Sequence, residues 1–284
     1  MDATQLVTLP PSFPDRVELV ASDFDRTLIA EDGVLRPRTL RALSASRAAG
    51  LHVVVVTGRM FRSVRPYLAQ AGLTDPVVCY QGAVVAEPGS GRFLRHVPTP
   101  LPTALEAIAA VEAEGYQLNC YVDDLLYVAH ETPEARAYAD FQHLEIHEVG
   151  DLGEWLSKPP TKLVVVGEPH RLDELEARLK ARFDGRLYIS KSLPWFLELA
   201  HPAVTKAAGL HFVAERLGVP RERTIAFGDG ENDLELVRWA GFGIAVANAH
   251  EHVLAAADWT CPSADDEGVA QVLEAVVAQP SERP

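Results

Sequence analysis

Hydrophobic positions in the first 100 residues alternate between two spacings. Continuous apolar runs, typical of strands covered on both faces, occur at 17–23, 51–57 and 76–83. Between them, apolar residues recur every three or four positions at 36–50 and 61–72, which predicts two helices. An order of strand, helix, strand, helix and strand predicts a parallel sheet with right-handed crossovers.

The pattern changes after the third predicted strand. A hairpin is expected at 84–97, around a Pro-Gly-Ser-Gly turn, and the proline-rich segment 97–102 has the composition of a linker. Hairpins mixed with helices then predict a separate α+β unit. Its expected elements are helices at 103–115, 131–144 and 171–185, a hairpin at 116–130 turning at Asp123 and Asp124, and strands at 161–167 and within 186–200.

The last third of the chain returns to the alternating pattern. Helices are expected at 205–218, 231–241 and 250–258, and strands at 223–230 and 241–249. We therefore predict an α/β fold, a Rossmann-like parallel-sheet core with an inserted α+β domain. The core would consist of residues 1–99 and 200–284, and the inserted domain of residues 100–199.

Composition and charge limit the possible partners. The chain has 284 residues, enough for two domains, and a formal net charge of -14. Because binding to a phosphate backbone needs basic surface, this charge argues against a nucleic-acid partner. An anionic ligand would have to be attracted by a local positive site, because the overall field repels it.

Other features indicate a cytoplasmic protein. The cysteines Cys79, Cys120 and Cys261 are far apart and lack the spacing of a metal site, so we expect free thiols. The first residues lack the basic and apolar segments of a signal peptide. No run approaches the roughly 18 apolar residues that span a membrane. No sequence feature defines an oligomeric state, and a monomer is compatible with the sequence.

Two aspartates end the first predicted strand, in the stretch VELVASDFDRTLI. Residues i and i+2 of a strand point the same way, so Asp23 and Asp25 can face one site while Phe24 points into the fold. Open parallel sheets bind ligands at the carboxyl ends of their strands. Two adjacent carboxylates need a proton or a cation between them, and Mg²⁺ favours such oxygen ligands. A solvated acidic turn is the alternative.

A second acidic turn, GDGEND, follows the strand predicted at 223–230. Asp229 lies between two glycines, which allow close approach of the backbone to a ligand. Asn232 and Asp233 open the next helix, where Asn and Asp are also common capping residues. Capping accounts for one of these residues and leaves the rest of the stretch unexplained.

Candidate phosphate-binding groups occur at two further ends of elements. Thr57 ends the second strand and can donate a hydrogen bond to a phosphoryl oxygen, and Gly58 allows a backbone N–H to approach an anion. Lys206 begins a helix, where a cation opposes the helix dipole, and this unfavourable placement suggests a role. The alternatives are a helix cap for Thr57 and a solvated side chain for Lys206.

Taken together and in this order, these residues resemble the haloacid dehalogenase-like phosphohydrolase superfamily. DFDRT matches its first motif, VVVVTGR the second, Lys206 the third and FGDGENDLEL the fourth. The closer likeness is to the Cof-type group of subfamily IIB, in which a larger α/β cap follows the third core strand. CYQGAVV and SLPWFLELAHPAVTK resemble segments of that group. Three residues depart from the usual pattern: Arg26 and Ala207 stand in place of glycine, and Gln81 in place of asparagine.

The resemblance implies a Mg²⁺-dependent phosphatase that hydrolyses a small phosphorylated metabolite, such as a sugar phosphate, through an aspartyl-phosphate intermediate. Asp23 would be the nucleophile and Asp25 the general acid and base, with Thr57 and Lys206 holding the phosphoryl oxygens. The Asp23 carboxylate, the Asp25 backbone carbonyl and the Asp229 carboxylate would hold Mg²⁺. The remaining expected site residues are Gly58, Arg59 and Asn232, which would contact substrate, and Asp233, which would orient Lys206.

The inserted cap is expected to select the substrate. Candidate contacts from the cap are Tyr121, Asp123, Lys191 and Ser192, for each of which a solvated strand or turn residue is the alternative. Trp195 and Phe196 are expected in the core of the cap. His250 and His252 are expected to be exposed and receive no role.

Three other functions are considered. A phosphomutase or phosphotransferase of the same superfamily shares all these motifs. A non-catalytic protein that binds Mg²⁺ or a phosphorylated metabolite would be expected to lack Asp23 or Asp25, and both are present. A dinucleotide-binding enzyme would need a Gly-x-Gly-x-x-Gly turn after the first strand, where this chain has the acidic DFDRTL.

Overall fold

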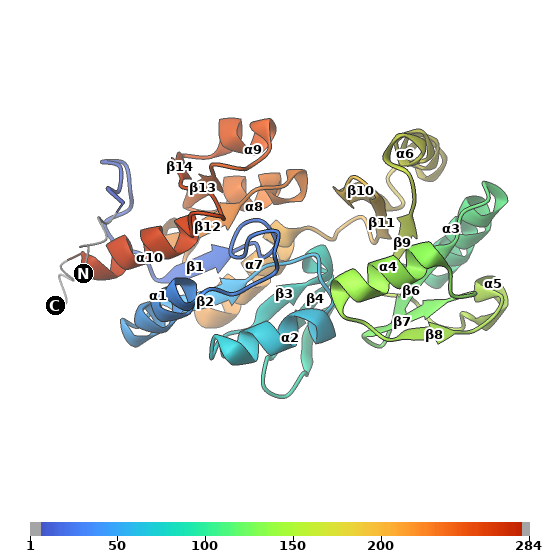
Figure 1. Ribbon diagram of the computed structural model, residues 1–284, viewed down its shortest axis with the longest axis horizontal. Coiled ribbons are helices and arrows are strands. Elements are labelled where there is room, and N and C mark those ends of the chain that lie inside the picture. Colours follow the sequence, from blue (N-terminus) through green and yellow to red (C-terminus); the bar gives the residue numbers. More distant parts are fainter. Residues whose placement is uncertain (1–6, 280–284) are drawn as a thin grey trace.

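The computed structural model describes residues 7–279. It has two lobes side by side along its long axis, as Figure 1 shows. The core lobe contains a five-stranded sheet and a smaller three-stranded sheet, and the cap lobe contains a six-stranded sheet. This arrangement confirms the predicted α/β class with a parallel core sheet and an added α+β unit. The residue limits predicted for the two domains stay a prediction.

The five-stranded sheet is parallel throughout, as the alternating pattern predicts. Strand β1 is fully buried and pairs with β2 on one side and with β12, the central strand, on the other. The carboxyl ends of these strands therefore meet at one edge. In spatial order the strands are β14 (Trp259–Cys261), β13 (Phe242–Val246), β12 (Thr224–Gly228), β1 (Leu19–Ser22) and β2 (His52–Val55).

Helices cover both faces of this sheet, which explains its continuous apolar strands. Apolar side chains of α1 (Pro37–Ala48), α2 (Phe61–Gln70) and α10 (Gly268–Ala278) pack on one face. Those of α7 (Lys206–Leu217) and α8 (Leu234–Trp239) pack on the other. The short helix α9 (Glu251–Ala256) packs against α8 and β13.

The third predicted strand is shorter than expected. It ends at Cys79 as β3 (Val77–Cys79), which continues the parallel sheet through one bridge between Val56 and Val78. Tyr80 and Gln81 then adopt left-handed backbone angles, with φ of 53° and 58°, in the turn η1 (Tyr80–Gly82). The predicted hairpin follows as β4 (Val84–Ala86) and β5 (Phe93–His96).

The cap lobe has one mostly antiparallel sheet with helices on both faces. Apolar side chains of α3 (Leu101–Ala113), α5 (Leu152–Trp155) and α6 (Pro169–Phe183) pack on one face. Helix α4 (Pro133–Gln142) packs on the other, within a cluster that continues into the core lobe. The strand order is β10 (Tyr188–Leu193), β11 (Phe196–Ala200), β9 (Lys162–Val166), β6 (Leu118–Val122), β7 (Leu125–Val128) and β8 (Ile146–Glu148).

Some elements differ from the sequence predictions. The elements β8, α5, β14 and α10 were not predicted. The expectation that Trp195 lies in the core of the cap is wrong, because its side chain is 49% exposed in the turn between β10 and β11. Phe196 is buried, as predicted.

Polar groups join the cap to the core at helix α2. The Asp124 carboxylate, in the β6–β7 turn, accepts hydrogen bonds from the backbone N–H groups of Phe61 (3.1 Å) and Arg62 (3.0 Å). It also accepts one from the Tyr80 hydroxyl at 2.7 Å. A carboxylate at a helix N-terminus satisfies free N–H groups and suits the helix dipole. A residue of the cap lobe therefore satisfies the free N–H groups at the start of a core helix.

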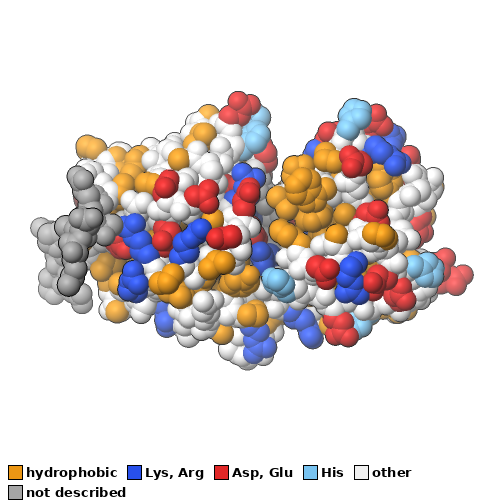
Figure 2. Space-filling model, in the orientation of Figure 1, with side chains coloured by type: hydrophobic (Ala, Val, Ile, Leu, Met, Phe, Trp, Pro, Cys, Tyr) orange, Lys and Arg blue, Asp and Glu red, His pale blue; other side chains and the backbone are white. Residues whose placement is uncertain are grey.

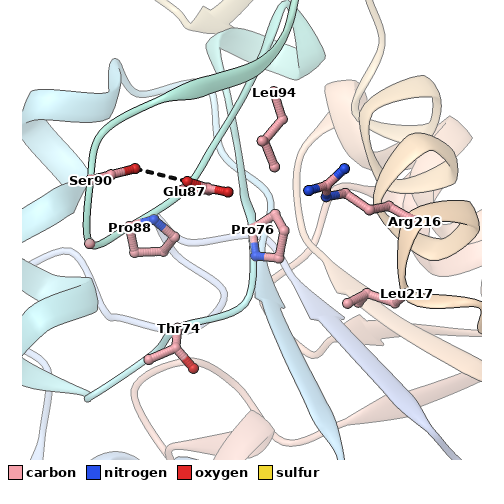
Figure 3. A pocket seen from close by; sticks show the side chains of 9 residues that line it. Thr74, Pro76, Glu87, Pro88, Ser90, Leu94, Arg216 and Leu217 are labelled. Carbon is pink, nitrogen blue, oxygen red and sulfur yellow. Dashed lines mark hydrogen bonds between the residues drawn. The ribbon is translucent and has the colours of Figure 1, made fainter.

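A shallow cavity of about 660 Å³ lies between the β4–β5 hairpin and the C-terminal end of α7 (Figure 3). It is lined by Pro76, Glu87 and Arg216 among others, and by none of the candidate site residues. At about 1.5 Å per residue, Leu217 at this cavity is roughly 16 Å from Lys206 along α7. The cavity is thus remote from the acidic edge of the sheet.

Among residues 7–279, no helix is both long enough and apolar enough to cross a membrane.

Candidate active site

Asp23 lies directly beyond strand β1, where its backbone N–H donates to the Phe227 carbonyl at 3.0 Å. Its side chain is almost completely buried, so the alternative of a solvated acidic turn is wrong. Phe24 points into the fold, as the strand spacing predicts, and packs edge-to-face against Tyr67. The parallel sheet thus fixes Asp23 at the edge where ligands of such folds bind.

Lys206 connects two of the buried carboxylates. Its Nζ atom lies 2.5 Å from Asp23 Oδ1 and 2.6 Å from Asp233 Oδ1. The side chain is only 2% exposed, so the alternative of a solvated lysine is wrong. Burial alone would lower the pKa of Lys206, but the attraction of Asp23 and Asp233 outweighs it and raises the pKa. Lys206 therefore carries a fixed positive charge beside Asp23.

Three buried carboxylates converge at this position. Oxygen atoms of Asp23, Asp229 and Asp233 lie within 4.8 Å of one another. Burial, followed by repulsion from Asp233, raises the pKa of Asp23 well above its ordinary value, although Lys206 opposes the shift. The same two causes raise the pKa of Asp229 to about 6. One lysine among three carboxylates leaves excess negative charge, so the cluster suits a bound cation.

The GDGEND turn is held by its own last residue. Asp233 Oδ2 accepts hydrogen bonds from the backbone N–H groups of Asp229 (3.2 Å) and Gly230 (3.0 Å). Thr27, from the first motif, donates its hydroxyl to Asp229 Oδ1 at 2.9 Å. Asp233 thus both pairs with Lys206 and shapes the loop that carries Asp229.

Asp25 is paired with Arg59. The guanidinium donates to both carboxylate oxygens, from Nε at 2.8 Å and from Nη2 at 2.6 Å. Arg59 itself is buried and lies over the rings of Phe24 and Tyr67. Burial would lower the pKa of Arg59, but the bonds to Asp25 more than compensate and raise it. Such a two-pronged ion pair fixes both the position and the orientation of the carboxylate.

The Thr57-Gly58-Arg59 turn faces the left-handed turn at Gln81. The Thr57 hydroxyl accepts the Arg59 N–H at 3.0 Å, so Thr57 stabilises its own turn and does not cap α2, which begins after Met60. A Cβ atom at Gly58 would lie only 2.4 Å from the Gln81 amide nitrogen, so a larger residue there requires Gln81 to move.

Gln81 also fixes Asn232. The Gln81 Oε1 atom accepts a hydrogen bond from Asn232 Nδ2 at 3.0 Å. The side chain of Gln81 is buried, and its backbone has a conformation that non-glycine residues rarely adopt. Gln81 therefore connects the second and fourth motifs, whose residues lie far apart in the sequence.

Arg26 also adopts a left-handed backbone angle, with φ of 62°, a conformation that glycine adopts more readily than any other residue. Its Nε atom lies 3.7 Å from Asp229 Oδ2 and 3.7 Å from Glu31 Oε1. Arg26 thus adds a partly exposed positive charge beside the carboxylate cluster.

The cap candidates lie in different environments. Tyr121 is buried and bonds the Tyr138 hydroxyl, at 2.5 Å. Asp123 pairs with Lys158, and Lys191 with Asp173, so both are engaged within the cap. Ser192 is half-buried in β10.

Sequence reasoning missed Lys162, which links the cap to the candidate site. Its Nζ atom donates to the Gly58 carbonyl at 3.1 Å and pairs with Glu198 Oε1 at 3.0 Å. The lysine is almost fully buried on strand β9. A charged residue inside the otherwise apolar run TKLVVVG was the available signal.

The geometry and the sequence agree on the class of protein. The chain belongs to the haloacid dehalogenase-like hydrolase family, whose sequence model matches residues 20–273. The predicted resemblance is therefore confirmed, and proteins similar to the chain over most of its length are named phosphatases. The chain is accordingly an enzyme, a phosphatase of this family.

Individual relatives are similar over nearly their whole length. A 5-amino-6-(5-phospho-D-ribitylamino)uracil phosphatase of Bacillus subtilis is 30% identical over 90% of this chain and 96% of its own. A pyridoxal phosphate phosphatase of Escherichia coli is 25% identical over 90% and 97%. The crystal structure of a Thermotoga maritima protein has a TM-score of 0.81 and 31% identity, covering 91% of this chain and 97% of that one.

Proposed function

We propose that the protein is a Mg²⁺-dependent phosphatase that hydrolyses a small phosphorylated metabolite, such as a sugar phosphate, through an aspartyl-phosphate intermediate. The observation that carries this proposal is the buried cluster in which Lys206 lies within hydrogen-bond distance of Asp23 and Asp233. A phosphate approaching Asp23 would meet a fixed positive charge in a chain whose net charge is -14. Phosphoryl transfer depends mainly on such positioning and charge stabilisation.

Asp23 would attack phosphorus as the nucleophile. Its buried carboxylate is held on one oxygen by Lys206, which limits its rotation. Lys206 and the Thr57 hydroxyl would stabilise the negative charge of the phosphoryl oxygens, and Gly58 and Asn232 would contact the same group. Asp233 would keep Lys206 in place.

Asp25 would protonate the leaving oxygen and then remove a proton from the attacking water. The Asp25 side chain is 36% exposed, so a water or a leaving group can reach it. Arg59 was predicted to contact substrate, but its two hydrogen bonds to Asp25 support a role in holding that carboxylate. We propose that Arg59 acts chiefly as a positioning residue for Asp25.

The residues present fit a hard divalent cation. Asp23 and Asp229 offer buried carboxylate oxygens of the kind that Mg²⁺ prefers, and their pKa values are raised by burial first and by repulsion from Asp233 second. These two carboxylates and the Asp25 backbone carbonyl would hold Mg²⁺, which when bound would offset the repulsion between nucleophile and phosphate. The cluster also contains Asp233, whose oxygens are engaged by Lys206 and the turn.

The purified chain should therefore release phosphate from p-nitrophenyl phosphate only when a divalent cation is present. We expect EDTA to abolish activity and Mg²⁺ to restore it, because the carboxylate cluster retains uncompensated charge without the cation. The measurement is the rate of phosphate release before EDTA, after EDTA, and after Mg²⁺ or Ca²⁺ is added back. Full activity in EDTA would rule out the metal assignment.

Replacing Arg59 with lysine should mainly lower kcat. Lysine keeps the charge but loses the two-pronged contact with Asp25. We expect kcat to fall roughly 10- to 100-fold, with little change in KM. This loss is smaller than the roughly 10²–10⁴-fold that a positioned acid–base group contributes, because Asp25 itself remains. The pH profile of kcat should also shift. Arg62→Lys is the matched control, since the Arg62 side chain is 61% exposed. A large rise in KM with unchanged kcat would instead support direct substrate contact.

The substrate class is proposed from the named relatives. They are phosphatases of 5-amino-6-(5-phospho-D-ribitylamino)uracil, pyridoxal phosphate and phosphoglycolate, all small molecules with one phosphate ester. We propose that the cap of residues 100–199 selects among such substrates. Values of kcat/KM over a panel of phosphorylated metabolites, with and without an acceptor sugar, would identify the substrate and reveal any phosphotransferase activity. A cytoplasmic location agrees with the three buried free thiols.

A further inference from the structure

A second group of metal-ligating side chains lies outside the carboxylate cluster. It consists of Glu231, in the short turn η3 (Glu231–Asp233), and of His250 and His252 at the start of α9. Glu231 Oε1 lies 2.5 Å from His250 Nδ1 and 2.8 Å from His252 Nδ1. All three side chains are at least 42% exposed. Figure 2 shows histidine and acidic side chains together on the core lobe, over the region of α9.

The convergence of these three groups differs from ordinary surface pairing. His170–Glu174 and His211–Glu215 are exposed pairs within one helix, each with a single imidazole, at 3.7 and 3.4 Å. Here two imidazoles from one element meet one carboxylate oxygen from another, with ligand atoms of all three residues within 4.8 Å. A bound cation would replace the direct contacts with bonds of about 2.0–2.2 Å to each ligand atom.

The ligand types indicate which cation fits. Two neutral imidazoles and one carboxylate, with a remaining position open to water, are the donor set of zinc sites. Imidazole suits zinc, copper, nickel and iron, whereas magnesium and calcium prefer oxygen ligands. The His–His–Glu group is therefore chemically distinct from the all-carboxylate cluster of Asp23, Asp229 and Asp233.

We propose that Glu231, His250 and His252 form a binding site for a divalent transition-metal ion of the zinc type. The metal would join the η3 turn to the start of α9. The start of α9 already bonds to the residues just before η3, where the His250 N–H donates to the Asp229 carbonyl at 2.8 Å. Because the metal would bind only the folded chain, it would also raise thermal stability.

The test is a zinc titration of the full-length chain, stripped with EDTA and dialysed into excess Mg²⁺ so that the carboxylate cluster is saturated. Calorimetry and the Tm are both measured. We expect one zinc equivalent and a zinc-dependent rise in Tm. His250→Gln and His252→Gln should weaken zinc binding by more than about 100-fold, since loss of a ligand's hydrogen-bond partner alone costs about 10- to 100-fold. The matched control His211→Gln should bind zinc normally.

The proposal is overturned if the two histidine variants bind zinc as the unmodified chain does. It is also overturned if Asp229→Asn loses the zinc signal while the histidine variants keep it, because zinc would then occupy the carboxylate cluster. Absence of any zinc binding overturns it as well. Glu231→Gln provides an independent ligand variant, and Tm without zinc verifies that each variant folds. Co²⁺ absorption gives a readout of imidazole ligation that does not depend on activity.

Discussion

Replacing Asp23 with asparagine should abolish turnover and leave the chain folded. The amide has the same shape as the carboxylate but cannot attack phosphorus, so we expect phosphate release to fall by at least about 10⁴-fold. Folding should not suffer, because burial and the charge of Asp233 already disfavour a charged Asp23, as its raised pKa indicates. The Tm without added metal should stay the same or rise.

The appropriate control is Asp140→Asn, an exposed aspartate that lies 3.9 Å from Arg136 on the cap. It should change neither Tm nor turnover appreciably, because exposed ion pairs contribute about 0–1 kcal/mol. Phosphate release and Tm are measured for both variants. Undiminished turnover in Asp23→Asn would remove Asp23 as the proposed nucleophile, whatever its position in the structure.

Replacing Lys206 with methionine should cost both activity and stability. Methionine fills a similar volume but leaves Asp23 and Asp233 buried without their shared cation. Removing one partner of a buried ion pair typically costs about 3–5 kcal/mol, and protonation of the raised-pKa Asp23 would reduce that cost. Turnover should fall strongly as well, because the proposed phosphate ligand is lost.

A double variant separates the two effects of Lys206. Lys206→Met combined with Asp233→Asn removes one of the two carboxylates left without a cation, so it should recover part of the stability and none of the turnover. Lys180→Met, on an exposed lysine that pairs with Glu176, is the control for loss of a lysine. Chemical denaturation and phosphate release are the measurements. A fully active Lys206→Met enzyme would contradict the assignment of Lys206.

Local sequence signals were sufficient for much of the fold. The strand-like runs around Val20, Val54 and Ile225 predicted parallel strands, and each is buried in the same sheet. The alternation of a strand likewise predicted that Phe24 points into the fold, where it is buried. Apolar residues recur at helical spacing along α10, whereas β8 and α5 have only three and four residues, too few for a periodic pattern.

Long-range pairing was the part that the sequence could not provide. Lys206 and Asp23 are 183 positions apart, and Thr27 and Asp229 are 202 apart, so local patterns do not show that these side chains pair with each other. Arg59 is the last residue of the second motif, for which substrate contact was predicted, but only the folded chain reveals its bonds to Asp25. The left-handed turn at Tyr80 and Gln81 was hidden for the same reason, since neither residue favours that conformation alone.

The contact between Asp124 and helix α2 has a consequence for how this enzyme can diversify. Three core groups donate hydrogen bonds to the Asp124 carboxylate, and two of them are the backbone N–H groups of Phe61 and Arg62. Every residue except proline has such an N–H group. Mutations that change those side chains therefore preserve the docking point itself. Other residues of the cap can therefore change while Asp124 keeps its hydrogen bonds to the core.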